Sequence, residues 1–377
     1  MAEAARSVSA RANRGLPYEI VIWEILVRLP PKALLRCRTV CRAWHHATSA
    51  HDFLLTHHAH QPVLPVAFSR DVGYPSIVTF DHRAADAQLQ RVTRLENRRV
   101  CGVYYSCDGL LLLCSHDTTG TYFCICNPAT RQSARLPSVS GYIILGLYRH
   151  HPTCEYRVVM YLENQEINGN DACYIFTLGS VQPPRNIGWQ PEAKEVYCSG
   201  GQPVLLHGSL HCPSEQREIG SNNVVVFNTS TELFRQMRAP VAPVAPRYNK
   251  LFEMDRVLGM YICNDGVTII DIWMLLDYEH EVWTFKCKIA LPVTEIKVMC
   301  GMHEGSRYAV VVPGNGELLV LVKFAGWLLQ VDLDGKLVAS FHGREVFPIQ
   351  LQLKQTLVPH AFFPKLDGNI VNAPFLI

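Results

Sequence analysis

The sequence predicts a multidomain chain of the α plus all-β class, in which a short helical segment precedes a long body of the β-propeller type. Three observations predict this. Apolar residues recur at helical spacing only between Leu16 and Trp44, alternation with a period of two begins near Val63, and similar turn segments then return about every 50 residues. We expect a disordered tail over residues 1–15, a helical domain over 16–61 and a propeller domain over 62–377.

The bulk composition excludes several classes of protein. The formal net charge of the 377 residues is only +2, which gives no electrostatic case for binding nucleic acid or an anionic membrane. No run of about 18 apolar residues is free of charged or turn residues, and the N-terminus lacks the apolar core of a signal peptide. We therefore expect an intracellular protein of the cytoplasm, the nucleus or both, with its 14 cysteines reduced.

Prolines delimit the first predicted helix. Pro17 suits the first turn of a helix, and Pro30 and Pro31 stop it because a proline ring cannot continue the hydrogen-bond ladder. One helix is therefore expected from Pro17 to Arg28. Its apolar side chains surround almost the whole helix axis, so it must be covered on more than one side.

A second amphipathic run follows from Ala33 to Trp44, with a break expected near Arg38 and Thr39. Ser49 or Asp52 could then cap a short helix that ends before Pro62. About 45 residues cannot bury all of this apolar surface, so part of it is expected to await a partner. Periodicity alone also allows a helical cap that packs only on its own chain.

The identity of particular residues favours a partner protein over a cap that packs only on its own chain. Their order and spacing resemble an F-box, and the matching residues are Leu16-Pro17, Glu24-Ile25-Leu26, Arg28-Leu29-Pro30, Lys32, Leu34, Arg36, Val40-Cys41 and Trp44. The resemblance implies a three-helix module that binds a Skp-type adaptor, which in turn binds a cullin in a ubiquitin ligase. Carried over by position, the adaptor-binding residues are Leu16, Pro17, Ile20, Ile25, Leu26, Leu29, Pro30, Leu34, Leu35, Val40, Cys41 and Trp44, some of which will instead hold the module together.

From Val63 onward, short alternating runs bounded by Gly, Pro, Asn and Asp predict strands and turns, and convincing helical stripes are absent. One hairpin pattern recurs, and its turn markers are Asp81, Asn127, Gly179, Asn228, Asp277 and Asp332. Steps of 46, 52, 49, 49 and 55 residues suit four-stranded kelch-type blades. We expect six blades, or seven if the chain ends jointly contribute one. A β-sandwich pair or an irregular β domain is the alternative.

The expected repeat is degenerate, because a Gly-Gly pair occurs only at Gly200-Gly201. Successive blocks such as SCDGLLLL (Ser106–Leu113), ICNPATRQSARLP (Ile125–Pro137) and VVVFNTSTELFRQMRAP (Val224–Pro240) resemble, in their order, the F-box-associated domain of plant F-box proteins. This resemblance covers most of residues 100 to 340. It implies a propeller-like domain that binds a substrate and brings no catalytic residues.

The residues themselves offer no chemistry of their own. The six histidines between His45 and His60 lack a zinc-type spacing, Cys124-x-Cys126 alternates along a strand, and no acid pair can be assigned. We therefore expect no catalytic, metal-binding or cofactor-binding residues and no cofactor.

Together, the two resemblances predict a non-catalytic subunit of a Skp–cullin–F-box ubiquitin ligase. The F-box would bind the Skp-type adaptor, and through it a cullin, while the propeller would hold a target protein for ubiquitination. The alternative is a propeller scaffold or interaction protein outside any ligase. The sequence identifies neither the target nor the loops that bind it.

Overall fold

A computed structural model describes most of the chain. The described residues are 16–70, 74–81, 88–95, 100–118, 120–136, 141–163, 171–199, 202–214, 223–240, 248–301, 307–314, 316–343 and 345–363. The expected disordered tail over residues 1–15 lies outside them. Two compact units are present: one contains the chain up to Gln61 together with Thr356–Val358, and the other contains Pro62–Gln355 and the chain from Pro359.

The helical unit begins with one continuous helical segment whose winding changes along its length. α1 (Tyr18–Ile20) leads into the π-helix η1 (Val21–Ile25), which leads into the 3₁₀-helix η2 (Leu26–Arg28). Leu29 and Pro30 have extended backbones, with ψ angles of 146° and 149°, so the helix stops where its prolines predict. The predicted limits are confirmed, whereas the irregular winding was not indicated by the sequence.

The second amphipathic run forms two helices, α2 (Pro31–Cys37) and α3 (Arg42–Ser49). The predicted break near Arg38 and Thr39 is therefore confirmed. Cys41 is the N-cap of α3, where its Sγ accepts a hydrogen bond from the backbone N–H of Trp44 at 3.4 Å.

The trailing helix α4 (His51–His60) ends before Pro62, as predicted. Its start differs from the prediction. Ala50 is the N-cap residue and provides no side-chain hydrogen bond, so the expected cap at Ser49 or Asp52 was wrong. Ser49 instead closes α3, and the short Ala50 corner leaves no room for a separate capping turn.

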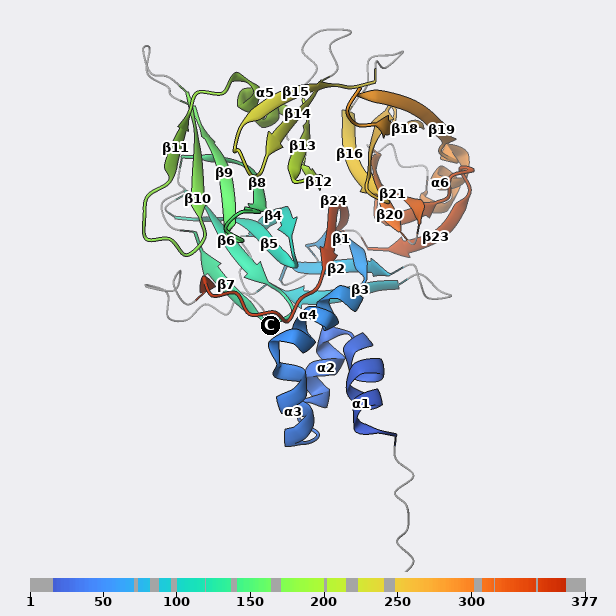
Figure 1. The fold of residues 1–377 in the computed structure, drawn as a ribbon. Helices are drawn as coiled ribbons and strands as arrows, with labels where there is room; N and C mark the ends of the chain where they lie inside the picture. The colour runs from blue at the N-terminus through green and yellow to red at the C-terminus, as the bar shows by residue number, and fades with distance from the viewer. Residues whose placement is uncertain are drawn as a thin grey trace, which may run out of the picture. The chain divides into compact units, whose positions relative to one another are not determined.

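The second unit is a propeller of six four-stranded antiparallel sheets, or blades, arranged in a ring (Figure 1). The strands of the first three blades are β24 (Val346–Lys354), β1 (Val63–Ser69), β2 (Ser76–Asp81) and β3 (Gln88–Arg94); β4 (Val100–Cys107), β5 (Leu110–Asp117), β6 (Gly120–Asn127) and β7 (Gln132–Arg135); and β8 (Ile143–Arg149), β9 (Tyr156–Leu162), β10 (Ala172–Thr177) and β11 (Arg185–Gly188).

The strands of the other three blades are β12 (Val204–Leu206), β13 (Ser209–Pro213), β14 (Asn223–Asn228) and β15 (Phe234–Arg238); β16 (Tyr248–Met254), β17 (Val257–Cys263), β18 (Ile269–Asp277) and β19 (Val282–Ala290); and β20 (Tyr308–Gly314), β21 (Glu317–Phe324), β22 (Trp327–Val331) and β23 (Leu337–His342). The expected propeller is confirmed with six blades. The seven-bladed and sandwich alternatives are wrong.

The two ends of the propeller sequence meet in the first blade. β24 pairs antiparallel with β1, from Val63 opposite Lys354 to Ser69 opposite Val346, and β24 lies beside both β4 and β20. It is therefore the inner strand of a blade whose other three strands come from the start of the propeller. The chain ends do build one blade jointly, but it is the blade already marked by Asp81, so no seventh blade results.

The predicted turn markers all lie at the same place in the fold. Each ends or follows the third strand of a blade, counted from the centre, where the chain turns toward the outer strand. In three of these turns, Asn127, Asn228 or Asp277 accepts backbone hydrogen bonds at 2.8 to 3.4 Å from residues two to three positions further on. The recurring Asn and Asp residues therefore have a local structural cause.

The hydrophobic core lies mainly between neighbouring blades. One cluster joins Val66 of β1 and Leu351 of β24 to Leu111 of β5, and another joins Ile272 of β18 to Val320 of β21. Each blade thus covers an apolar face that its neighbour cannot cover alone, which is the physical reason for a ring.

Two short helices interrupt the strands, α5 (Pro191–Ser199) between β11 and β12 and α6 (Val293–Cys300) between β19 and β20. The strand-like periodicity did not indicate either of them, and each occupies a connection between blades. Among the described residues, no helix combines the length and the apolar character that crossing a bilayer requires.

Candidate adaptor-binding surface

The helical unit has a small core of its own. Among its described residues between Leu16 and Gln61, six large apolar side chains are less than 5% exposed, and they are Ile22, Leu26, Val27, Leu34, Phe53 and Leu54. Phe53 and Leu54 belong to α4, and the Phe53 ring also packs on Trp23 with ring centroids 5.5 Å apart. The trailing helix therefore completes a core that the first three helices would leave open.

Two groups of hydrogen bonds hold these helices in place. Arg38 donates to both the carbonyl oxygen and Oγ1 of Thr48, at 2.6 and 3.2 Å, which ties the end of α2 to α3. His57 Nε2 and Gln61 Nε2 lie 2.8 and 3.1 Å from the carbonyl oxygen of Leu29. They satisfy a carbonyl that the end of the first helix leaves without an intrahelical partner.

The start of the first helix lies beside the start of α3. The Tyr18 hydroxyl donates to the carbonyl oxygen of Ala43 at 3.2 Å, and η1 packs on α3. Leu16 and Pro17 immediately precede Tyr18 in the sequence, and Val40 and Cys41 precede Ala43, so this hydrogen bond connects the two segments that contain these predicted residues.

The twelve residues predicted to bind an adaptor separate by exposure. Leu26 and Leu34 are buried and hold the module together, while Leu29 and Trp44 are half-buried. The other eight are exposed in this chain, and they are Leu16, Pro17, Ile20, Ile25, Pro30, Leu35, Val40 and Cys41. Leu16 and Val40 are the most exposed of the large apolar residues among them, at 63% and 65%.

Exposed apolar side chains at this density mark a surface that another protein can cover. Tyr18 and Trp23 are also at least 45% exposed, although the sequence did not indicate them as binding residues. A buried core and a separate exposed apolar set within the same helical unit are the arrangement expected of a docking module.

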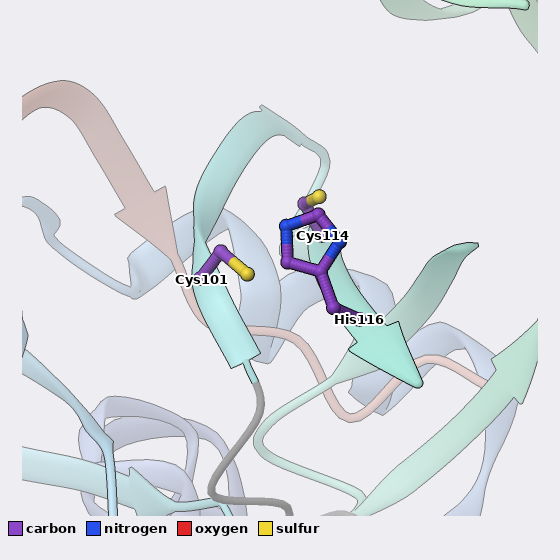
Figure 2. A group of neighbouring side chains, drawn as sticks. All are labelled: Cys101, Cys114 and His116. Carbon is purple, nitrogen blue, oxygen red and sulfur yellow. The ribbon is translucent and has the colours of Figure 1, made fainter. Parts of the chain in front are cut away.

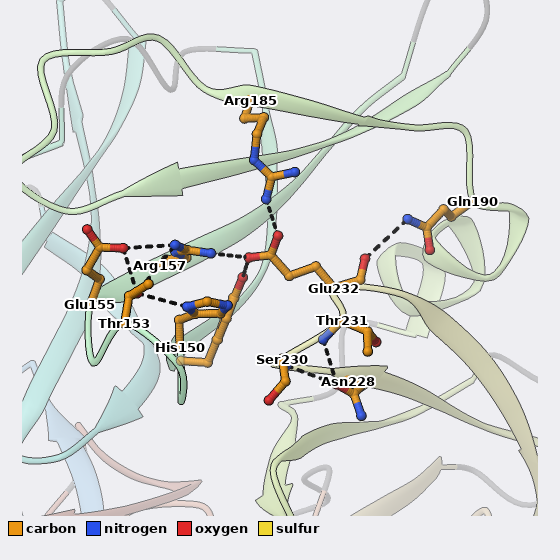
Figure 3. A network of polar contacts seen from close by, with 11 residues as sticks. His150, Thr153, Glu155, Arg157, Arg185, Gln190, Asn228, Ser230, Thr231 and Glu232 are labelled. Atoms are coloured by element: carbon orange, nitrogen blue, oxygen red, sulfur yellow. Dashed lines mark hydrogen bonds and ion pairs between the residues drawn. The ribbon is translucent and has the colours of Figure 1, made fainter.

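A polar cluster around Glu232 in the propeller has a structural role. The Tyr148 hydroxyl and the Arg157 guanidinium donate to Glu232 Oε1 at 2.7 and 2.8 Å, and Arg185 donates to Oε2 (Figure 3). These three partners lie on β8, β9 and β11, whereas Glu232 lies in the turn between β14 and β15. Glu155 is a second acceptor for Arg157, at 2.8 Å. Two acids and two arginines join the blades with balanced charge.

One group of side chains that could together hold a metal ion was not among the candidates named from the sequence. Cys101, Cys114 and His116 place their ligand atoms within 4.8 Å of one another, and no other such group of three occurs among the described residues (Figure 2). Cys114-x-His116 on one strand is the signal that could have indicated it, but Cys101 comes from another strand. Cys124 and Cys126, which the sequence analysis considered, are both buried.

Comparison with known proteins agrees with both parts of the fold. Residues 14–59 match the F-box-like family model, and residues 74–325 match the model of the F-box associated beta propeller domain. Among curated proteins from Arabidopsis thaliana, the putative F-box protein At5g50220 is 25% identical over 285 residues, which cover 73% of this chain and 70% of that protein.

Two further Arabidopsis relatives have the same extent of similarity. F-box protein At5g49610 is 25% identical over 292 residues, covering 72% of this chain and 78% of that protein. F-box protein CPR1 is 25% identical over 303 residues, covering 71% of each. The chain therefore belongs to the plant F-box proteins that carry a C-terminal F-box-associated β-propeller domain.

Proposed function

We propose that the protein is the substrate-recognition subunit of a Skp–cullin–F-box ubiquitin ligase. The observation that carries this proposal is the set of eight exposed residues on a helical unit whose own core is already complete. Family membership supports the Skp-type adaptor as the partner of this surface, and the cullin as the partner reached through the adaptor.

In this role the protein contributes position and no chemistry. The propeller would hold a target protein, and the F-box would hold the propeller on the ligase core. A short tether of this kind raises the effective concentration of the target at the transfer machinery to the millimolar range. The proposal therefore requires no catalytic residue and no cofactor from this chain, and it places the protein inside the cell, in the cytoplasm, the nucleus or both.

The test is co-purification of the full-length chain with a Skp-type adaptor. Val40→Asp places a charge on the most exposed of the large apolar residues in the predicted adaptor-binding set without touching the core. Loss of an apolar anchor commonly costs about 2 kcal/mol or more, so we expect adaptor affinity to fall roughly thirtyfold or more. Leu29 is also a predicted adaptor-binding residue, but it is half-buried and its carbonyl oxygen contacts His57 of α4. A charge at Leu29 could therefore disturb the fold as well as the binding surface, so Val40→Asp separates the two effects better than Leu29→Asp.

The matched control is Val181→Asp, which places the same charge on a propeller valine that is 94% exposed. We expect this variant to bind the adaptor like the wild type, and both variants to keep the wild-type circular dichroism spectrum and melting temperature. Equal binding by all three proteins would overturn the assigned surface. No binding by the wild type would instead favour the propeller scaffold that works outside a ligase.

A further inference from the structure

The strongest feature outside the F-box is the group formed by Cys101, Cys114 and His116 in the second blade. Figure 2 shows the two thiols and the imidazole converging from neighbouring strands, with the sulfur of Cys101 directed toward the histidine ring. Cys114 is buried, Cys101 is half-buried and His116 is exposed. The group therefore extends from the interior of the blade to solvent, so that an ion can reach it.

The strand geometry explains why the three side chains meet. Cys114 and His116 are two residues apart on β5, so the pleat directs both to the same face of the sheet. Cys101 lies at an irregularity of β4, where the register shifts between Val100 and Gly102. A bulge of this kind re-aims a side chain, and here it brings the Cys101 thiol to the pair on β5.

A neighbouring hydroxyl group orients one of the three ligands. His116 Nδ1 lies 2.8 Å from Thr121 Oγ1, on the strand β6 that pairs with β5. If Nδ1 donates this hydrogen bond, Nε2 keeps its lone pair for a metal, which is the usual arrangement of a histidine ligand. His116 therefore has the outer contact that fixes a metal ligand in place.

We propose that Cys101, Cys114 and His116 form a Zn²⁺ site with a water molecule as the fourth ligand. Two thiolates and one imidazole are soft-to-borderline ligands that suit zinc, and three protein ligands with one open position are typical of open, tetrahedral zinc sites. The described residues place no further His, Cys, Asp or Glu in the group. Binding would release the thiol protons to solvent, so no oxidant or reductant is needed.

The test is a metal titration of the full-length, metal-stripped protein, kept reduced with a phosphine. Co²⁺ serves first as a spectroscopic probe, because thiolate coordination gives a charge-transfer band in the near ultraviolet that coordination by histidine alone does not give. We expect one equivalent of Co²⁺ to produce this band and Zn²⁺ to displace it. Zn²⁺ should also raise the melting temperature, since a ligand that binds only the folded state stabilises it.

His116→Ala and Cys101→Ser are the diagnostic variants, because neither residue is fully buried. Each should lower the affinity for Co²⁺ at least tenfold and weaken the charge-transfer band, while the metal-free melting temperature stays close to that of the wild type. The matched controls are His280→Ala, another exposed histidine, and Cys287→Ser, another half-buried cysteine. Both controls should titrate like the wild type.

Three results would overturn the site. The first is a folded, reduced wild-type protein without a charge-transfer band, and the second is a band that persists unchanged in His116→Ala and Cys101→Ser. The third is a disulfide between Cys101 and Cys114 that persists under the reducing conditions, shown by intact mass and peptide mapping. That result would identify the pair as a structural cross-link in place of a metal site.

Discussion

Two glutamates occupy the same turn position in successive blades, but their ion pairs differ in burial. Glu232 and Glu281 each lie four residues after the Asn or Asp that opens the turn, with φ angles of 58° and 57°. Each reaches back to arginines of the preceding blade. The Glu232 side chain is 8% exposed and contacts Arg157, which is also largely buried, whereas Glu281 is 21% exposed and its arginines lie at the surface.

We predict that Glu232→Gln lowers the free energy of unfolding by roughly 3 kcal/mol, the lower end of the cost of breaking a buried ion pair, because one partner, Arg185, is 57% exposed. Glu281→Gln, at the same backbone conformation, should cost less than about 1 kcal/mol. Urea unfolding of the two variants measures the difference. Equal losses would mean that the turn, and not the buried pairing, determines the effect.

The ion pair between Glu232 and its arginines also predicts that the stability of the fold depends on pH. Burial acts to raise the pKa of Glu232, but the hydrogen bonds from Arg157, Tyr148 and Arg185 outweigh it and hold the pKa below its ordinary value. The folded chain therefore binds fewer protons here than the unfolded chain, whose glutamates have a pKa of about 4.3. The stability that Glu232 contributes is complete above that pH and is lost as the pH falls through the lower, folded value.

Melting curves from neutral pH downward test this sign. The wild type should lose its advantage over Glu232→Gln as the pH falls below about 4. A difference that stays constant down to the acid unfolding of the wild type would contradict the depressed pKa. The pH dependence belongs to this one carboxyl group, so the Glu281→Gln variant should keep it.

At the scale of the element, most of the correct predictions of helix ends and turns came from prolines and from the Asn and Asp residues of turns. Pro30 and Pro31 end the first helix wherever the rest of the chain lies, and Asn127, Asn228 and Asp277 fold their turns through contacts a few residues away. These signals are local, so a single sequence contains them. The π-helical winding of Val21–Ile25 has no such local signal in the sequence.

Gly335 lies where two neighbouring blades approach each other closely. It lies in the turn between β22 and β23 with a φ of 81°, and a Cβ there would overlap the carbonyl oxygen of Ala290 at the end of β19. Gly316 has nearly the same φ, 80°, but no described atom lies within 4 Å of its Cβ position. Substituting the two glycines therefore separates two contributions to the loss of stability: the unfavourable backbone conformation, and the overlap of a new Cβ with a neighbouring blade.

We predict that Gly335→Ala lowers the free energy of unfolding by roughly 3 kcal/mol, of which about 1 to 2 kcal/mol comes from the positive φ and the remainder from overlap with the neighbouring blade. Gly316→Ala should lose only the conformational part. Chemical denaturation of both variants gives the two values. Equal losses would show that the blades can separate at Gly335 with little cost.

At the scale of the whole molecule, the ring depends on one pairing that no local pattern contains. β24 joins β1 across almost the entire propeller sequence, with Leu353 opposite Leu64. The recurring turns predicted the blades and their approximate number, but they mark the outer hairpins, whereas closure takes place at the inner strand. The group of Cys101, Cys114 and His116 could not be predicted for a related reason, since Cys101 reaches Cys114 only through a bulge in a paired strand.

Closure by β24 predicts that a destabilising substitution in this last strand also destabilises the first strands of the propeller. Leu353 is 1% exposed and packs with Val66 of β1 and Leu111 of β5. Leu353→Ala should lower the free energy of unfolding by about 3 kcal/mol, the usual cost of truncating a buried leucine. Hydrogen exchange followed by mass spectrometry should show reduced protection in β1 and β2, although these strands lie far from Leu353 in the sequence.

Leu258→Ala is the matched control, because Leu258 is also 1% exposed but lies on β17, in the core shared with the β12–β15 blade. At equal destabilisation it should loosen its own core and leave β1 and β2 protected. If both variants instead lowered protection evenly around the ring, the six blades would open as one cooperative unit. If Leu353→Ala loosened β24 alone, the strand would be an appended edge and the first blade would be stable without it, which contradicts closure of the ring by β24.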